Sequence, residues 1–550
     1  MRSGRSGPNL DSTAEHGHNH EVSPARTTLV LSALLLGCGA MTCGKPPETA
    51  DRPEDVDDSE AALALEDPPA GSETGSELEV LPAYSREALA ARFDAQRALL
   101  GQESLFEDAE GRPLAPPLEP SEGENPGLGS IDDDILAALP GSSGIRVDES
   151  GEIVTGELAR NGNALGLFVP IEQPRGNAAM AHFYAALEAL EKQPHGAEGD
   201  AKVRVLIFGA SHTQADVYPG YLRAYLQTRF GDGGSGYLAL TRVNGWFRYN
   251  DWSIDDTKGW TVEHAQRKTS RKDGFYGLLG ASGSSSSKRD KTLLIPRAGV
   301  VAGQYEIYYL AQPGGGSFRV LVDGKKLVTV DTDAKQLGPG YHPFGVDEGE
   351  HVLEVQAVGD GEVRLFGVTA EREQPGVVID TLGIAGTRAA NLLRWDQDVL
   401  ADNLRHRKPD LIVLAYGTNE ATDEDQSMTR YRADLREVLT RLQAAAPQAS
   451  CLLVGPGDFP REVDEDVWTV RPRVLEIVEA QRDVAYELGC GFWDTLAFMG
   501  GSNSMHTWAT SRPQMASRDH IHLTKRGYVR MGMVLTDALM SGYDRTHGVP

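Results

Sequence analysis

The stretch Val203-Arg-Val-Leu-Ile-Phe-Gly-Ala-Ser-His-Thr213 decides the fold, because an apolar strand runs directly into a turn of small residues that carries a serine. A helix is predicted over 218–230 and ends at Gly231. Short apolar strands that alternate with amphipathic helices are typical of a parallel sheet covered on both faces. The sequence therefore predicts an α/β domain around this strand.

The same alternation returns in the C-terminal part of the chain. Strands are predicted at 377–380, 411–416, 451–454 and 491–493, and helices at 389–404, 428–445 and 467–488. Another amphipathic helix, over 177–192, precedes the first strand. We expect all of these segments to form one sheet with helices on both faces.

A different pattern separates the two parts, because apolar and polar residues alternate from 240 to 373. Asp323-Gly324 is a hairpin signal between two such runs. This pattern predicts an all-β, sandwich-like module inserted into the α/β domain, whose own parts are then 156–239 and 374–550.

Composition narrows the range of partners. The 550 residues suffice for two or three domains, and 53 Lys and Arg against 80 Asp and Glu give a formal charge of −27. Such a charge repels phosphate backbones, so we expect no nucleic-acid partner.

Residues 44–155 are acidic and rich in Pro and Gly, and we expect a largely disordered linker there, with a short helix over 85–100. The oligomeric state stays open.

Residues 1–43 have the features of an export signal. The apolar run from Thr27 to Leu36 is shorter than the roughly 20 residues of a membrane span but suits a signal peptide. Leu35-Leu36-Gly37-Cys38 resembles the bacterial lipobox, so Cys38 is a candidate lipidation site. We expect translation to begin near Val22 and the His tract from His16 to His20 to have no role.

The chain has four cysteines, too few for a disulfide scaffold. Cys38 and Cys43 lie in the export region. Cys451 and Cys490 begin predicted strands, where they are either buried thiols or one bridge, and we expect free thiols.

Two polar residues follow predicted strands. Ser211 stands at the carboxyl end of a parallel strand, where open α/β sheets bind ligands, although a serine there is also typical of a helix cap. Asn419, in Tyr416-Gly-Thr-Asn-Glu420, either caps its loop or donates its amide to a developing oxyanion, which is worth roughly 3 kcal/mol.

Two further elements complete the set. Asp519 and His522 lie three residues apart in Asp519-His-Ile-His-Leu-Thr524, so a carboxylate can orient an imidazole, with His520 as the rival base. The two histidines could also suggest a metal site, but no further ligand cluster supports one, so no metal is expected. Leu382-Gly-Ile-Ala-Gly-Thr387 offers either glycine N–H groups for an oxyanion or ordinary turn glycines.

Together the four elements resemble the four blocks of the SGNH (GDSL-type) hydrolases. The resemblance implies a flavodoxin-like parallel sheet, a nucleophile at Ser211 and a triad completed by Asp519 and His522, with no cofactor. Ala210 departs from the Asp of the family's G-D-S block, and that Asp is not a triad member.

The same resemblance implies an oxyanion hole. Its donors would be the backbone N–H groups of Ser211 and Gly386 and the side-chain amide of Asn419. Gly386 is preferred to Gly383 because it immediately precedes the Thr of the second block.

A narrower resemblance, over residues 160–545, is to peptidoglycan O-acetylesterases of Gram-negative bacteria. It rests on segments 209–216, 230–236, 416–421, 492–494, 499–501, 519–524 and 527–528. Those enzymes also carry a β-rich insertion between the first and second blocks. The resemblance implies removal of O-acetyl groups from a cell-wall glycan by an exported, periplasmic lipoprotein of a Gram-negative bacterium.

The same residues are compatible with three other functions. They are a non-catalytic glycan-binding lipoprotein, a lipase or thioesterase, and an acetyltransferase. Trp508 is predicted to stack on a sugar, whereas Trp493, at a strand end, is predicted to lie in the core.

Overall fold

The parallel sheet of the computed structural model has five strands in the order β15-β3-β16-β17-β20, and every neighbouring pair is parallel. Their bounds are β3 (Lys202–Gly209), β15 (Gly376–Gly383), β16 (Leu411–Ala415), β17 (Ser450–Val454) and β20 (Gly491–Trp493). The first strand in the chain lies between the second and the third, which is the flavodoxin-like order with its switch point at β3. The predicted fold class is confirmed.

The structure describes residues 146–147, 153–154, 169–173, 178–193, 199–245, 247–268, 270–464, 467–511 and 514–546. The predictions for the export signal, for Cys38 and for the helix over 85–100 lie outside these ranges. A hairpin of β1 (Arg146–Val147) and β2 (Ile153–Val154) forms at the end of the predicted linker. Among the described helices, none is long and apolar enough to cross a membrane.

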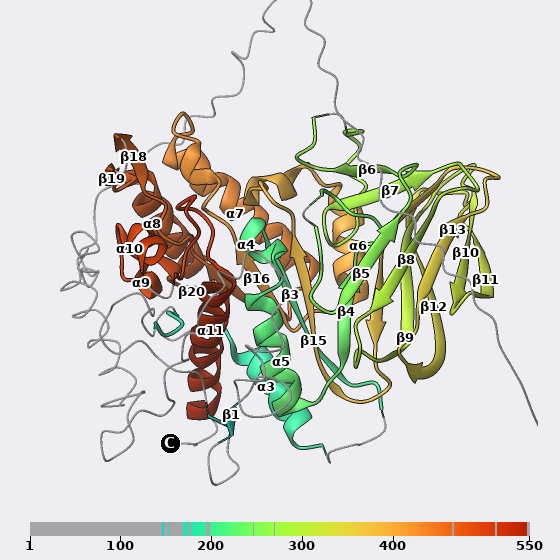
Figure 1. The fold of residues 1–550 in the computed structure, drawn as a ribbon, viewed down its shortest axis with the longest axis horizontal. Helices are drawn as coiled ribbons and strands as arrows, with labels where there is room; N and C mark the ends of the chain where they lie inside the picture. Colours follow the sequence, from blue (N-terminus) through green and yellow to red (C-terminus); the bar gives the residue numbers. More distant parts are fainter. Residues whose placement is uncertain are drawn as a thin grey trace, which may run out of the picture. The chain divides into compact units, whose positions relative to one another are not determined.

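Helices cover both faces of the parallel sheet (Figure 1). One face packs against α3 (Ala181–Glu191), α5 (Tyr218–Phe230) and α11 (Lys525–Thr546). The other packs against α6 (Gln397–Arg407), α7 (Met428–Ala445) and α8 (Pro472–Glu487). Along β3, Val205 and Ile207 face the first layer whereas Leu206 and Phe208 face the second, which explains why the strand is apolar throughout.

Two predicted helices are wrong in part. The segment 389–404 divides into the 3-10 helix η1 (Ala389–Arg394) and α6, because the Asp396 side chain accepts the N–H groups of Asp398 and Val399 and so starts a new helix. The segment 467–488 begins with β19 (Val467–Thr469), which forms a hairpin with the preceding β18 (Arg461–Asp464). Pro472 then opens α8, because proline disfavours a helical residue before it.

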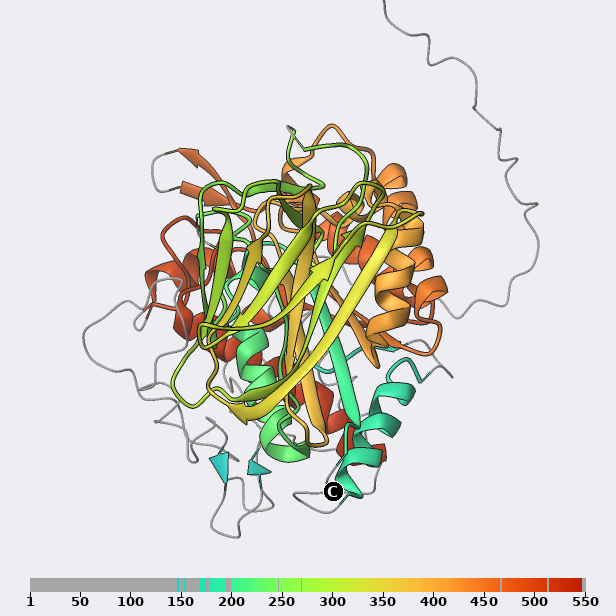
Figure 2. The same cartoon turned by 90° about the vertical axis from the view of Figure 1, so that its right-hand side faces the viewer.

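The inserted segment forms two antiparallel sheets (Figure 2). One has the order β11-β10-β13-β8-β5 and the other β12-β9-β14-β7-β6, with β4 paired to β14. Asp323 and Gly324, both at positive φ, form the predicted hairpin turn between β10 and β11. The bounds are β4 (Gly234–Leu238), β5 (Trp252–Asp256), β6 (Thr261–His264), β7 (Ala281–Ser285), β8 (Lys291–Pro296), β9 (Ala302–Ala311), β10 (Ser317–Val322), β11 (Lys325–Asp331), β12 (Gly338–Gly349), β13 (Leu353–Ala357) and β14 (Val363–Glu371).

An ion pair and a backbone hydrogen bond connect this β module to the α/β domain. Asp216, which lies five residues after Ser211, accepts hydrogen bonds from Arg223 at 2.9 Å and from the backbone N–H of Asn250 at 2.8 Å. Arg223 also pairs with Asp251 at 2.9 Å. Because Asn250 and Asp251 lie in the module, directly before β5, these contacts fix it beside the turn that carries the serine.

The expectation of free thiols is wrong, because Cys451 and Cys490 form a disulfide. The two strands lie side by side, and their register pairs Leu452 with Gly491. The preceding residues on each strand are therefore adjacent, with a Cα separation of 4.7 Å that suits a bridge.

Candidate active site

Ser211 is the first residue of the short helix α4 (Ser211–Gln214), which begins two residues after β3 ends. Gly209 makes this tight turn possible, because a Cβ at that position would lie 2.0 Å from Thr213 Oγ1. Ala210, where the family that the sequence resembles has Asp, is 4% exposed. The turn therefore presents the serine at the carboxyl edge of the sheet, at the switch point.

Ser211, His522 and Asp519 form a continuous chain of contacts. His522 Nε2 lies 2.9 Å from Ser211 Oγ, and His522 Nδ1 lies 2.6 Å from Asp519 Oδ2. The second carboxylate oxygen accepts the backbone N–H groups of Ile521 and His522, each at 3.0 Å. This arrangement suits the transfer of a proton from the serine hydroxyl to the imidazole.

The charge state of Asp519 supports that geometry. Burial raises its pKa, but hydrogen bonds from the His522 ring and from the N–H groups of Ile521 and His522 outweigh burial and lower the pKa to about 2. The carboxylate is therefore ionised at neutral pH and holds a proton on Nδ1 of His522, which leaves Nε2 to accept one.

His520, the rival base, is turned away from the serine. Its Nδ1 lies 3.0 Å from the carbonyl oxygen of Arg518 and its Nε2 lies 3.1 Å from His506 Nδ1. Trp468 of β19 stacks on the ring at 3.7 Å. The backbone of His520 is left-handed, with φ of 55°, which the sequence pattern does not reveal.

The two candidate oxyanion donors lie on loops that are tied together. Asn419 immediately precedes the 3-10 helix η2 (Glu420–Thr422), and its Nδ2 donates to the carbonyl oxygen of Thr387 at 2.8 Å. An amide nitrogen carries two hydrogens, so the second remains for a ligand. Gly386 has φ of +79°, a conformation that favours glycine. Within the described ranges, no hydrogen bond occupies the Gly386 N–H.

Gly383, the alternative to Gly386, serves packing. A Cβ there would lie 2.3 Å from the backbone nitrogen of Gln214. The side chain of Gln214 in turn accepts the N–H of Ala385 at 2.8 Å and so supports the loop that carries Gly386.

Sequence reasoning gave no role to two residues that contact the site. Gln266, between β6 and β7 of the β module, donates to the carbonyl oxygen of Gly386 at 2.6 Å. His212, next to the serine, lies 2.8 Å from Tyr528 Oη through its Nδ1. His212 and Tyr528 both stand inside segments that carry the family resemblance, which was the available signal, whereas nothing in the sequence marks Gln266.

The prediction for Trp508 is wrong. Its ring is 0% exposed and packs edge-on against Phe498 at 5.3 Å, so no sugar can stack on it. Trp493, also 0% exposed, is confirmed as a core residue, and its indole N–H donates to the carbonyl oxygen of Val169 at 2.8 Å.

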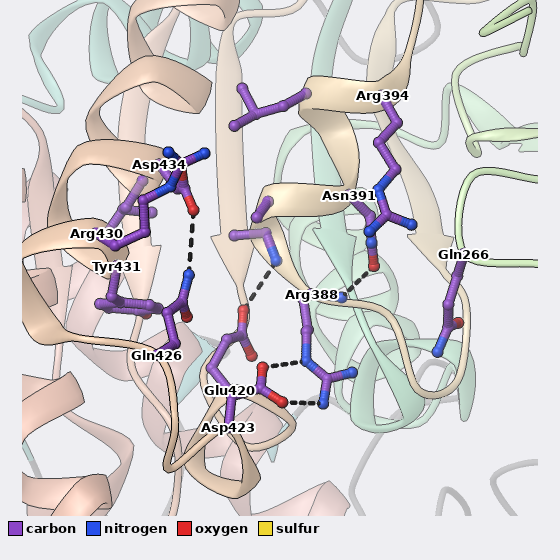
Figure 3. A pocket seen from close by; sticks show the side chains of 14 residues that line it. Gln266, Arg388, Asn391, Arg394, Glu420, Asp423, Gln426, Arg430, Tyr431 and Asp434 are labelled. Carbon is purple, nitrogen blue, oxygen red and sulfur yellow. Dashed lines mark hydrogen bonds and ion pairs between the residues drawn. The ribbon is translucent and has the colours of Figure 1, made fainter. Parts of the chain in front are cut away.

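Hollows of different size adjoin these residues. A small one of about 30 Å³ is lined by residues that include His212, Thr418 and Ile521. A larger one of about 660 Å³ begins beside the candidate oxyanion loops and extends to α7 (Figure 3). Within the described part of the chain, no cluster of three or more His, Cys, Asp or Glu side chains could hold a metal ion.

Comparisons with known proteins agree with this fold. The model of the GDSL-like Lipase/Acylhydrolase family matches residues 350–530, which include Gly386, Asn419, Asp519 and His522. No curated protein sequence matches significantly. The solved structure titled "Peptidoglycan O-acetylesterase in action, 5 min" has 23% identity and a TM-score of 0.57, covering 68% of this chain and 99% of its own.

Two carbohydrate esterases of family two are more distant. The one from Cellvibrio japonicus has 15% identity and a TM-score of 0.23, covering 53% of this chain and 98% of its own. The one from Clostridium thermocellum, in complex with cellohexaose, has 14% identity and a TM-score of 0.22, covering 54% of this chain and 100% of its own. The family match, over residues 350–530, and the order of the parallel strands make this part of the chain similar to the GDSL-like lipases and acylhydrolases, a family of carboxylic ester hydrolases.

Proposed function

We propose that this protein is a serine esterase that removes O-acetyl groups from a cell-envelope polysaccharide, in the first place peptidoglycan. The observation that carries the proposal is the chain of contacts from Asp519 through His522 to Ser211, at the carboxyl edge of the sheet. Likeness of fold to a solved peptidoglycan O-acetylesterase supports the choice of substrate.

In the proposed mechanism, His522 Nε2 takes the proton of Ser211 as the serine oxygen attacks the acetyl carbonyl. The N–H groups of Ser211 and Gly386 and the Nδ2 of Asn419 donate to the oxyanion. The sugar leaves as an alcohol with the proton from His522, and the acetyl group remains on Ser211. Water, activated by the same imidazole, then releases acetate, and no step calls for a cofactor.

We place the methyl of the acetyl group in the small hollow of about 30 Å³ beside His212, the residue that follows Ser211. A lipase or thioesterase would prefer long chains, so activity that falls with acyl length from acetyl onward separates these functions. Acetyl transfer that outcompetes hydrolysis would indicate an acetyltransferase.

The proposal also includes a place of action. Export through the signal in residues 1–43 and a lipid anchor at Cys38 would hold the enzyme in the periplasm of a Gram-negative bacterium, beside its glycan. Metabolic labelling with a fatty acid, compared between the wild type and Cys38→Ala, tests the anchor.

The function is tested by acetate release from purified O-acetylated peptidoglycan, acetylated xylan and acetylated alginate. We expect the wild type to release acetate from peptidoglycan and Ser211→Ala to bind the glycan without releasing any. Undiminished turnover by Ser211→Ala would refute the assignment. Glycan binding by a wild type that hydrolyses no ester would support a non-catalytic binding protein instead.

A further inference from the structure

The larger hollow is shared between the catalytic domain and the β module. It is lined on one side by Arg388, Asn391 and Arg394 of the η1 segment and on the other by Glu420 and residues of α7, with Gln266 of the β module at its edge. We call it the Arg394 hollow. Its volume of about 660 Å³ lies within the roughly 300–1,000 Å³ of typical ligand sites.

The Arg394 hollow begins where the candidate oxyanion loops end. Arg388 follows Gly386 by two residues, and Glu420 directly follows Asn419. Gln266, which lines the hollow, also holds the carbonyl oxygen of Gly386. A polymer whose acetyl group reaches Ser211 therefore has an adjacent space for its neighbouring units.

Most charges in the hollow are paired. Arg388 makes two hydrogen bonds to Asp423, one of them at 2.7 Å, and Arg430 pairs with Asp434 at 2.8 Å. Glu420 is 3% exposed and accepts the N–H groups of Ala389 and Gly417. In Figure 3, dashed lines join Arg388 to Asp423 and Gln426 to Asp434, whereas none joins Arg394 to a carboxylate.

Arg394 differs from the other cations of the hollow. It is exposed, and the one side-chain hydrogen bond that it makes within the described residues goes to the carbonyl oxygen of Ala265 at 3.3 Å. No carboxylate of the described ranges pairs with it. A guanidinium presents a planar fork of donors that matches a carboxylate, and in a chain of net charge −27 such a group gives an acidic ligand a specific point of attachment.

We propose that the Arg394 hollow is a subsite for a carboxylate-bearing part of the acetylated glycan, and that Arg394 recognises the carboxylate. This inference rests on the proposed esterase function and specifies its substrate class as acidic. The carboxylate belongs either to a sugar of the backbone, as in a uronate, or to a peptide branch, as in peptidoglycan.

Steady-state acetate release tests the subsite with three soluble substrates: O-acetylated peptidoglycan fragments, acetylated oligouronates, and acetylated xylo-oligosaccharides without carboxylates. The variants are Arg394→Gln, Arg394→Lys and the control Arg405→Gln, whose side chain is 59% exposed on α6. The readout is the ratio of kcat/KM for each acidic substrate to that for the neutral one.

We expect Arg394→Gln to lower this ratio about tenfold through KM, because a charge-assisted hydrogen bond is lost. Arg394→Lys restores part of the ratio, and Arg405→Gln keeps the wild-type value. Salt at about 0.5 M lowers the wild-type ratio, because it screens the attraction between the guanidinium and the carboxylate. Whichever acidic substrate loses its advantage in Arg394→Gln identifies the source of the carboxylate.

The subsite is refuted if Arg394→Gln keeps the wild-type ratio of kcat/KM, or if it loses activity equally on acidic and neutral substrates. In either case acetate release by the wild type still supports the esterase function. A wild type that releases acetate from none of the three substrates overturns the esterase function and the subsite with it.

Discussion

The imidazole of His212 lies 5.4 Å from that of His522, centroid to centroid, and its Nδ1 is 2.8 Å from Tyr528 Oη. Burial, and then repulsion by His522, lower the pKa of His212 to about 3, so this ring is neutral at physiological pH. A neutral neighbour adds no positive charge that would oppose protonation of His522 during the attack.

We expect Tyr528→Phe to lower kcat about tenfold with little change in KM, because His212 loses its hydrogen bond and no longer holds the neighbouring imidazole in place. Initial rates on a chromogenic acetyl ester measure the effect. The phenylalanine keeps the ring that packs in the core, so the melting temperature should change little. Unaltered kcat would show that the contact between Tyr528 and His212 has no part in the reaction.

Replacing each histidine of the C-terminal loop separates the two candidate bases. His522→Ala should lower kcat on the order of 10⁴-fold, because the serine then has no proton acceptor. His520→Ala should stay within about tenfold of the wild type, since the lost stacking on Trp468 only loosens the loop. The opposite ranking of these variants would make His520 the base.

Asp458, which lines the small hollow, should make stability depend on pH. Burial raises its pKa from 3.8 to about 6 against opposing backbone hydrogen bonds, one from the N–H of Met505 at 2.9 Å. The folded state therefore binds a proton more tightly than the unfolded chain. The free energy of unfolding should fall by up to about 3 kcal/mol as the pH rises from about 4 through about 6.

Urea unfolding of Asp458→Asn at pH 4 and pH 7 checks this dependence. The neutral amide should remove most of the fall in the free energy of unfolding between pH 4 and pH 7. The control variant Asp255→Asn, at an exposed position, should show the same fall as the wild type. An equal decline in wild type and Asp458→Asn would show that other groups cause it.

The bridge between Cys451 and Cys490 should contribute to stability. It closes a loop with a sequence separation of 39, and removing both thiols by alanine substitution should lower the free energy of unfolding by about 3 kcal/mol. Reductant should destabilise the wild type to a similar extent and leave the double variant unchanged. Insensitivity of the wild type to reductant would mean that the two thiols are not joined in solution.

Local patterns predicted most of the catalytic domain. Apolar runs located the parallel strands, and the helices over 218–230 and 428–445 have the bounds that the sequence predicted. The helix over 467–488 was placed too early because its amphipathic pattern continues through the hairpin before Pro472. The limits of the inserted module remain a prediction, although β4 already pairs with its strands before residue 240.

Contacts between distant segments were harder to predict. The disulfide depends on the register of two strands, which no local pattern contains. Trp508 is buried by a helix packing that hydropathy does not resolve, and Gln266 reaches Gly386 across 120 positions of sequence. Five residues of the candidate site were named from local sequence motifs: Ser211, Gly386, Asn419, Asp519 and His522.

The hydrogen bond from Gln266 to Gly386 means that the β module cannot be exchanged without affecting the α/β domain. Replacing the inserted strands by a short linker would keep every residue of the proposed triad but release the loop that carries Gly386. Engineering a minimal esterase from this chain would therefore require a new support for that loop, and grafting a foreign β module would succeed only if it supplied an amide at the same point.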